Sequence, residues 1–249
     1  MSISKSVRFI MAWLFALVIV PVAAGQIPDK FTNLKVLPEN VSKQELMDTM
    51  KGFTRALGMR CDDCHAGDPT KGFAGFDFPS DEKQNKKTAR LMMQMVHAIN
   101  TNYIDKVVGD PGPSVKVECI TCHHGQNRPR MLADVLNDVL QRDGLDSTIA
   151  RYHELRDEYY GSFTYDFTAE PLDEVAMGQS EAGHYDDAIA LFKLNLEMNP
   201  NSLITLYQLG EAYAASGDKA KAIEQLEACL KIRPDRRIQR RIDELKGEQ

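Results

Sequence analysis

Two stretches near the C-terminal end of the chain superimpose on each other with a shift of 34 residues. They are AGHYDDAIALFKLNLEMNP, residues 182–200, and SGDKAKAIEQLEACLKIRP, residues 216–234. Gly183 coincides with Gly217, and each stretch ends in a proline. A helix–turn–helix unit that recurs with this period packs on its neighbours to form an α-helical solenoid. The repeat therefore predicts an all-α fold for this part of the chain.

The period and the small residues resemble the tetratricopeptide repeat, which implies a TPR-like solenoid over residues 170–249. Such arrays usually need about three units for stability. We therefore expect residues 131–169 to form a degenerate helical hairpin that supplies a further unit. The stretch RRIQRRIDELKGEQ is expected to cap the other end, and Cys229 is interpreted as a small buried residue within a repeat helix.

Two Cys-x-x-Cys-His motifs lie ahead of the repeats. They consist of Cys61, Cys64 and His65, and of Cys119, Cys122 and His123. A thiol pair followed directly by a histidine is typical of a c-type haem site, in which the thiols bond the vinyl groups and the imidazole binds the iron. The sequence therefore predicts two covalently bound c-type haems in a small all-α cytochrome domain over residues 26–130, ahead of the solenoid.

Zinc binding and disulfide chemistry are the alternative interpretations of the four paired cysteines. Zinc ribbons usually bring their cysteine pairs within roughly 15–20 residues of each other, whereas Cys64 and Cys119 are much further apart. A thioredoxin-like motif is expected beside a βαβ pattern, and the sequence shows no such pattern. Both observations favour haem attachment.

The stretch NVSKQELMDTMKGFTRALGMRC before the first motif predicts a helix. Ser42 and Glu45 have the spacing of a capping box, and Gly58 is suited to end the helix. Met50 lies at the centre of its apolar face, so its thioether is our candidate for the sixth ligand of the first iron. The alternative is a core methionine, because methionine commonly fills irregular gaps.

The stretch FPSDEKQNKKTARLMMQMVHAINTNYI before the second motif predicts another helix, with Ser80 as its N-cap and two acidic residues in its first turn. Met92 and Met95 lie on its apolar face. We expect Met92 to be the sixth ligand of the second iron, with Met95 as the next candidate. His97 is a stronger iron ligand in general, but it lies off this face and is the other alternative.

The segments MKGFTRALGMRCDDCH, TARLMMQMVHAINTNYI and VECITCHHGQNRP together resemble the cytochrome c subunit of photosynthetic reaction centres, over about residues 34–129. That family presents an axial methionine on a helix ahead of its motifs, which implies Met50 and Met92 as iron ligands. The chain has two motifs where the family usually has four, so it resembles half of such a subunit. A remote histidine ligand of that family has no obvious counterpart in this sequence.

The N-terminal 25 residues are interpreted as a signal peptide, because a basic start is followed by an apolar run and small residues. Covalent haem attachment takes place outside the bacterial cytoplasm, so we expect a periplasmic protein. Retention of the segment as a membrane anchor is the alternative, since the apolar run approaches the length of a membrane span. The formal net charge of −6 argues against nucleic acid as a partner.

These features predict an exported electron-transfer protein and not an enzyme, because no additional acid–base group accompanies either motif. The repeats are expected to dock it to a redox protein or to a membrane-associated electron-transfer complex. Seven Lys and Arg against three Asp and Glu over residues 231–246 would attract a negatively charged partner or an anionic membrane surface, although a solvated face of a capping helix is the favoured interpretation. The alternatives are a haem-based sensor or enzyme with a displaceable sixth ligand, and an assembly scaffold with structural haems.

Overall fold

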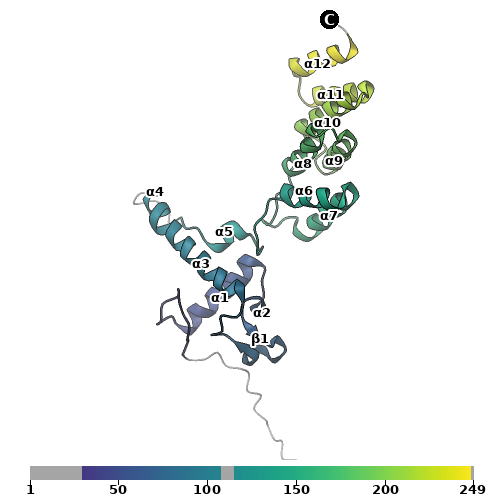
Figure 1. Ribbon diagram of the computed structural model, residues 1–249. Helices are drawn as coiled ribbons and strands as arrows, with labels where there is room; N and C mark the ends of the chain where they lie inside the picture. The colour runs from purple at the N-terminus through teal and green to yellow at the C-terminus, as the bar shows by residue number, and fades with distance from the viewer. Residues whose placement is uncertain (1–29, 108–114, 248–249) are drawn as a thin grey trace, which may run out of the picture. The chain divides into compact units, whose positions relative to one another are not determined.

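The computed structural model describes residues 30–107 and 115–247 (Figure 1). The predicted signal peptide lies outside these described residues. Within them, no helix is both long enough and apolar enough to cross a membrane. The described residues divide into two compact units, of which the first comprises residues 30–48 and 60–95, and the second comprises residues 49–59, 96–107 and 115–247.

The first unit contains the first motif and a small two-stranded sheet. Its strands pair antiparallel, with Ala66 opposite Asp77, around an intervening 3₁₀ segment. The helix before the motif begins in this unit and continues into the second. The elements in chain order are α1 (Lys43–Leu57), α2 (Cys61–Cys64), β1 (Ala66–Gly67), η1 (Pro69–Gly75), β2 (Phe76–Asp77) and α3 (Gln84–Ile99).

The second unit contains the second motif and a stack of antiparallel helix pairs (Figure 1). The pairs are formed by helices that follow each other in the sequence, as the 34-residue period predicts. The elements are η2 (Asn100–Ile104), α4 (Asp105–Val107), α5 (Cys119–His123), α6 (Leu132–Asp143), α7 (Leu145–Tyr159), α8 (Ala169–Glu181), α9 (Tyr185–Met198), α10 (Leu203–Ser216), α11 (Lys219–Ile232) and α12 (Arg236–Lys246).

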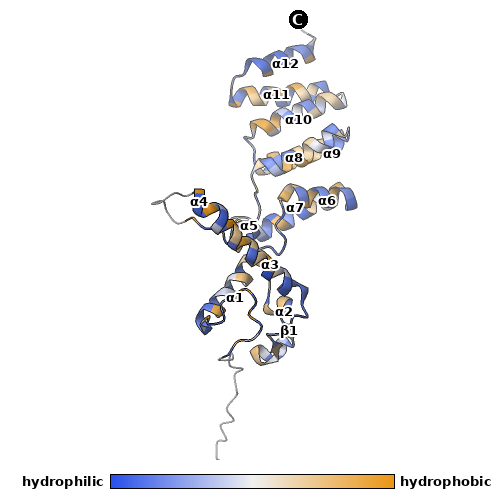
Figure 2. Cartoon of the chain, turned by 60° about the vertical axis from the view of Figure 1, so that its left-hand side comes forward, coloured by the Kyte–Doolittle hydropathy of each residue, from blue (hydrophilic) through white to orange (hydrophobic). Residues whose placement is uncertain are grey.

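The all-α expectation is confirmed, and the main apolar core lies in the helix stack. Leu136 of α6, Tyr152 of α7, Leu172 of α8 and Phe192 of α9 are fully buried in one continuous cluster. In α12, Ile242 is buried on a helix whose other faces are mostly charged, which is the pattern expected of a capping helix (Figure 2). Cys229 of α11 is also fully buried, as expected.

A buried polar network joins three helices of the repeats. The amide Nδ2 of Asn195 donates to Asp173 Oδ1 at 2.7 Å and to the carbonyl oxygen of Ala169 at 2.8 Å. The hydroxyl of Thr205 donates to the other carboxylate oxygen of Asp173 at 2.9 Å. Because buried polar groups are costly unless they are paired, this network fixes the register of α8, α9 and α10.

The predicted capping box of α1 is present. The side chain of Glu45 accepts from the amide of Ser42 at 2.9 Å, and the amide of Glu45 donates to the Ser42 hydroxyl at 3.2 Å. The pKa of Glu45 is lowered, chiefly by the hydrogen bond from the Ser42 amide. At the other end, Gly58 adopts a φ of 62° directly after the helix, as expected of a helix-terminating glycine.

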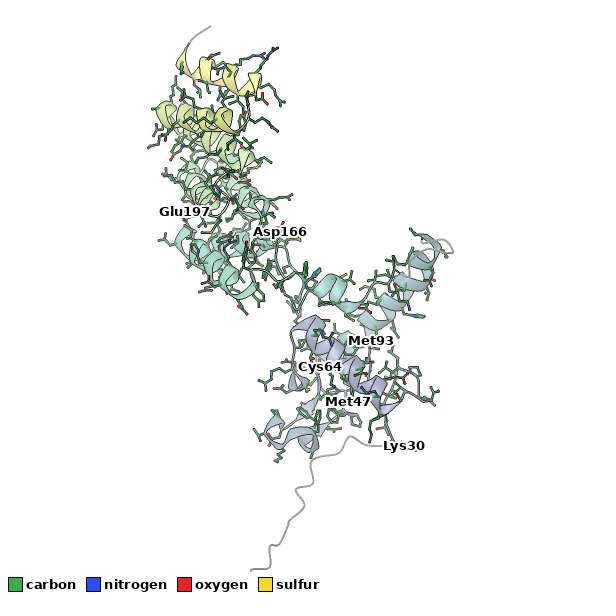
Figure 3. All side chains as sticks on the ribbon, turned by 180° about the vertical axis from the view of Figure 1, so that it is seen from behind. Lys30, Met47, Cys64, Met93, Asp166 and Glu197 are labelled. Carbon is green, nitrogen blue, oxygen red and sulfur yellow. The ribbon has the colours of Figure 1, made fainter. Side chains whose placement is uncertain are left out.

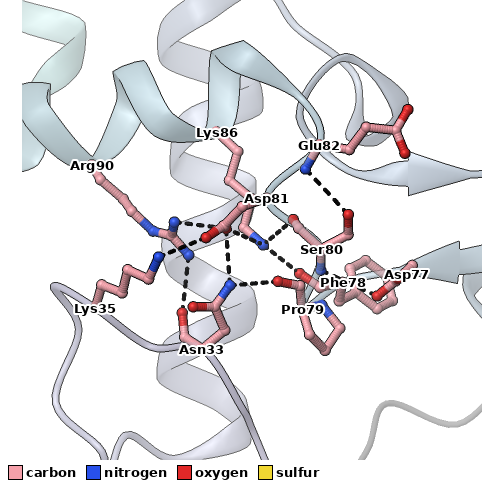
Figure 4. Close-up of polar contacts among 10 residues, drawn as sticks. All are labelled: Asn33, Lys35, Asp77, Phe78, Pro79, Ser80, Asp81, Glu82, Lys86 and Arg90. Atoms are coloured by element: carbon pink, nitrogen blue, oxygen red, sulfur yellow. Dashed lines mark hydrogen bonds and ion pairs between the residues drawn. The ribbon is translucent and has the colours of Figure 1, made fainter.

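The prediction that Ser80 caps the second helix is wrong, because α3 begins only at Gln84. The reason is that Asp81 is bound elsewhere: its carboxylate pairs with Lys35 at 2.7 Å and with Arg90 at 2.7 Å (Figure 4). These cations hold the pKa of the Asp81 carboxyl far below its usual range. The Ser80 hydroxyl instead accepts from the amide of Glu82 in a local turn.

The second helix also ends differently from the expected regular helix through Tyr103. The α-helical pattern stops at Ile99, and residues 100–104 form a π-helical turn. Asn100, at the start of this turn, makes two hydrogen bonds of 2.8 Å to the backbone of Val117, one with its Oδ1 and one with its Nδ2. The π-helical turn therefore places the Asn100 side chain against the backbone of Val117, two residues before the first cysteine of the second motif.

Candidate haem-binding motifs

Each motif places its two cysteines on one face of a very short helix. In α2 the carboxylate of Asp63 accepts from the amide of Arg60 at 2.7 Å, and in α5 the Thr121 hydroxyl accepts from the amide of Glu118 at 3.0 Å. In both motifs, therefore, the side chain of the residue before the second cysteine accepts a hydrogen bond from the backbone amide of the residue before the first cysteine. This fixes the two thiols at an i, i+3 spacing, which places them on the same side.

All four motif thiols are free and none forms a disulfide. Burial is the main cause of the raised pKa values of Cys64 and Cys119, so these groups stay protonated at neutral pH. Reactive dithiols typically have a lowered thiol pKa, so these raised pKa values do not indicate a redox pair. In the described part of the chain, no group of three Cys, His, Asp or Glu residues is arranged to hold a metal ion.

The first histidine lies against an aromatic cluster that follows the motif. The ring of His65 meets Phe78 edge to face at 5.0 Å, and Phe78 in turn lies 5.5 Å from Phe76 and 6.2 Å from Phe73. These rings come from the η1 and β2 segment. A flat apolar macrocycle bound by His65 would find aromatic partners here, so the surroundings fit a haem. Figure 3 shows Cys64 in the same unit.

The electrostatic surroundings keep His65 neutral. Burial and the Lys86 ammonium lower its pKa, with burial the larger cause. The Nδ1 atom of His65 is buried without a hydrogen-bond partner in the described residues. The carbonyl of Phe78 has the opposite effect and raises the pKa of His65. The same carbonyl accepts a hydrogen bond from Lys86 Nζ at 2.6 Å. A neutral imidazole is the form that binds iron.

The second histidine has different surroundings. His123 is only 9% exposed, and its Nδ1 lies 2.8 Å from the carbonyl oxygen of Gln126. Because a carbonyl oxygen can only accept, Nδ1 carries a proton here, and in the neutral ring Nε2 keeps its lone pair. That tautomer is the one that a metal-binding histidine needs. The arrangement therefore fits an iron ligand.

Backbone segments on both sides hold the second motif. Before the motif, Asn100 binds Val117, as described above. After it, the amide of Gly125 donates to the carbonyl of Ala56 at 2.9 Å. The Thr164 hydroxyl donates to the carbonyl of His124 at 2.8 Å. The loop that carries the Gln126 carbonyl is thus fixed by α1 and by the segment between α7 and α8.

The candidate sixth ligands lie where the sequence placed them along α1 and α3. Met50 and Met92 are half-buried, Met95 is 44% exposed, and His97 is exposed. The structure brings together the cysteines and histidine of each motif, but it does not bring Met50 and His65, or Met92 and His123, into one compact unit. These two iron-ligand pairings stay predictions.

The apolar faces of the helices before the motifs have little cover of their own. In α1 only Ala56 is buried, and in α3 no residue is. The half-buried residues of the α1 face are Leu46, Met50, Phe53 and Leu57. Apolar surface of this extent suits a large apolar cofactor, since its burial is the main favourable term in packing such helices.

The helical fold, the two Cys-x-x-Cys-His motifs and the helix stack together define a c-type cytochrome joined to an α-helical solenoid. The photosynthetic reaction centre cytochrome c subunit model matches residues 19–175, and the chain belongs to that family. The tetratricopeptide repeat model matches residues 180–242, so the cytochrome-like part is fused to such repeats.

The chain is also similar to one characterised member of this family. It is 28% identical over 126 residues to the photosynthetic reaction center cytochrome c subunit of Rubrivivax gelatinosus. The match covers 43% of this chain and 33% of that protein. The chain thus matches about a third of the length of its relative.

Sequence reasoning missed several residues that shape the two sites. The aromatic cluster at His65 is visible in the sequence as FAGFDF, a stretch of six residues after the first motif that contains three phenylalanines. The contacts of Asn100 and Thr164 had no such signal, because each joins segments that are distant in the chain. The family model extends to residue 175, which includes Thr164.

Proposed function

We propose that the protein is an exported dihaem c-type cytochrome that transfers single electrons and docks to a redox partner through its repeats. The observation that carries this proposal is the pair of motif helices, each of which presents two free thiols beside an imidazole suited to bind iron. A c-type haem, when bound, supplies reversible one-electron chemistry at its iron. The chain's own part is to attach, orient and partly bury that group.

The assignment as an electron carrier and not an enzyme rests on family membership and on the proposed axial methionines. Met50 and Met92 would raise the potentials of the two irons and close their sixth positions to small ligands. A sensor or a haem enzyme would need an open or displaceable sixth position. Exposure of the reduced protein to carbon monoxide separates the two: an electron carrier should show no spectral change, and a sensor should show one.

The proposed location is the periplasm, with residues 1–25 removed on export. The basis is the basic start and apolar run of that segment, together with the need for haem attachment outside the cytoplasm. Intact-mass analysis of protein purified from its host should give a chain that starts near Gly25 or Gln26. A mass that includes residues 1–25 would instead favour a retained anchor.

The repeats are proposed as the docking part. Exposed apolar side chains occur on α10, where Ile204 is 65% exposed and Tyr207 is 36% exposed, and exposed arginines line α12. The relative is named as a subunit of a photosynthetic reaction center, and we propose a membrane-associated electron-transfer complex as the partner of this chain. Its acidic net charge argues against nucleic acid.

The haem count tests the central proposal. Full-length protein should carry two haems per chain by pyridine haemochrome assay and by mass. Changing Cys61 and Cys64 to alanine should remove one haem, and changing Cys119 and Cys122 to alanine should remove the other. Cys229→Ala is the matched control, because Cys229 is a buried thiol outside both motifs and its loss should leave both haems. Retention of two haems in either double variant would refute the assignment.

A further inference from the structure

Gln126 stands between the second motif and the chain segment that leads into the repeats. Its backbone carbonyl accepts from Nδ1 of His123 at 2.8 Å, and its backbone amide donates to the carbonyl of His123 at 2.8 Å. The acceptor of the imidazole proton is therefore a loop carbonyl and not a side chain. The position of that carbonyl depends on what holds Gln126.

Two residues from the segment after α7 hold the side chain of Gln126. The hydroxyl of Tyr165 donates to Gln126 Oε1 at 3.1 Å, and Gln126 Nε2 donates to the carbonyl of Thr164 at 3.3 Å. The amide is thus bound at both its oxygen and its nitrogen by neighbouring residues. Thr164 binds the same loop a second time, because its hydroxyl donates to the carbonyl of His124 at 2.8 Å.

Tyr165 is itself fixed by aromatic packing. Its ring meets Tyr159 edge to face at 5.4 Å and Phe167 at 6.2 Å. Phe167 is buried in the core cluster of the helix stack, and Tyr159 packs against that cluster. The position of the Tyr165 hydroxyl is therefore set by the core of the helix stack, and through Gln126 the same core sets the carbonyl that faces His123.

A hydrogen bond to the second nitrogen of a metal-binding histidine raises the basicity of the ligand. A more basic imidazole stabilises the ferric form and lowers the reduction potential of the iron. The hydrogen bond between His123 Nδ1 and the Gln126 carbonyl is a contact of this kind.

We propose that Tyr165 and Thr164 are positioning residues for the second haem: through Gln126 they hold the carbonyl that strengthens His123 as an iron ligand and lowers the potential of that haem. The inference rests on the proposed function, since it requires a haem at the second motif. It assigns to the segment between α7 and α8 a part in setting the redox potential, in addition to joining cytochrome and repeats.

The test uses the full-length holoprotein in which Cys61 and Cys64 are alanine, so that the second haem alone is titrated. Tyr165→Phe removes the hydroxyl and keeps the ring, and Gln126→Leu removes both side-chain hydrogen bonds but keeps the backbone carbonyl. Both should raise the potential of the second haem and shift the ferric electron paramagnetic resonance g values. Tyr160→Phe is the matched control: Tyr160 is 66% exposed on the same segment, and its loss of a hydroxyl should change neither readout.

The haem content of the variants distinguishes a failure of the proposed function from a failure of the positioning role. If the second motif of the parent protein carries no haem, the proposed function itself fails. If haem is present and neither Tyr165→Phe nor Gln126→Leu changes the potential or the g values, while far-ultraviolet circular dichroism shows both variants folded, the positioning role is overturned. A shift of equal size in Tyr160→Phe would overturn it as well, because the effect would then not depend on the Gln126 contacts.

Discussion

Gly58 and Gly125 lie so close together that a Cβ atom on Gly58 would stand 2.1 Å from the carbonyl oxygen of Gly125. Both glycines have positive φ angles, 62° and 87°, that side chains rarely adopt. The end of α1 and the loop after the second motif therefore pack backbone against backbone. The contact joins two segments that are more than sixty residues apart in the chain.

We predict that Gly58→Ala weakens the structure around the second motif. The methyl group would have to displace the Gly125 carbonyl, and the left-handed backbone adds strain of about 1–3 kcal/mol. Denaturant unfolding followed at the haem absorption band should show a lower midpoint, and the second haem should be incorporated less completely. Gly52→Ala is the control: its Cβ would meet nothing within 4 Å, and it should stabilise α1 by about 1 kcal/mol. Equal effects of both substitutions would contradict the close contact.

The assignment of Met50 to the first haem can be tested in chains that carry one haem each. Where Cys119 and Cys122 are alanine, Met50→Leu should lower the potential of the remaining haem and abolish the weak far-red methionine–ferric band. Leucine keeps the volume, so the packing should largely survive at a cost below about 1.5 kcal/mol. Met47→Leu, a change at a half-buried methionine of the same helix, should leave the spectrum unchanged.

Met50 would be a core residue only if its loss changed neither the far-red band nor the potential. An effect seen instead where Cys61 and Cys64 are alanine would assign Met50 to the second haem, and the predicted pairing with His65 would be wrong.

For the second haem, we predict that Met92→Leu lowers the potential and removes the far-red band. Met92 is half-buried, whereas Met95 is 44% exposed and His97 is exposed. Met95→Leu and His97→Ala serve as comparisons in the same single-haem background. Loss of the band in Met95→Leu alone would transfer the ligand role to Met95. A spectrum that changes only in His97→Ala would indicate bis-histidine ligation.

Much of the fold could be predicted because it depends on local patterns. The Ser42 and Glu45 capping box forms with contacts only three residues apart, and the helix pairs of the repeats follow from small residues and prolines at fixed spacing. The motif residues are equally local. Cys229 was correctly expected to be buried, because a free thiol behaves as a small apolar residue and this one lies among the apolar positions of a repeat helix.

The errors and omissions come from contacts between distant segments. The sequence around Ser80 is typical of a helix N-cap, with Asp81 expected in the first turn. In the structure, the Asp81 carboxylate instead binds Lys35, which lies 46 positions earlier in the chain. The hydrogen bond from Tyr165 to Gln126 spans 39 residues and has no periodic signal. Sequence spacing predicts the residues that would bind the haem, whereas the contacts that would orient those ligands became visible only in three dimensions.

The position of Lys86 gives a prediction for the first haem. Its ammonium lowers the pKa of His65 and is itself held by the carbonyls of Phe78 and Ser80 at 2.6 and 2.7 Å. A fixed positive charge near the iron ligand disfavours the ferric form. Lys86→Gln should therefore lower the potential of the first haem, as measured by redox titration where Cys119 and Cys122 are alanine. Lys87→Gln, at the exposed neighbouring position, should have little effect; equal shifts would indicate a general charge effect.

The last prediction concerns docking of the repeats to a partner. The linker hairpin and the repeats share one apolar core, so the two parts cannot be separated for the test. Leu136 and Tyr152 of the predicted linker hairpin are buried in the same cluster as Leu172 and Phe192 of the repeats. A chain cut before the repeats would expose that cluster, so its failure to bind would have a trivial cause. Surface charge in the intact protein is the better variable.

Arg236 and Arg240 are exposed at the basic C-terminal end on α12. We predict that changing both to glutamate weakens association with membranes from the native host, most strongly at low ionic strength, because screening over about 10 Å at 0.1 M salt reduces such attraction. Both haem potentials should stay unchanged. Lys83→Glu with Lys87→Glu makes the same change of charge at exposed positions just before and within the first turn of α3, and this variant should bind as the parent protein does. If the lysine variant loses binding and the arginine variant keeps it, the partner docks on the cytochrome part and the repeats serve another purpose.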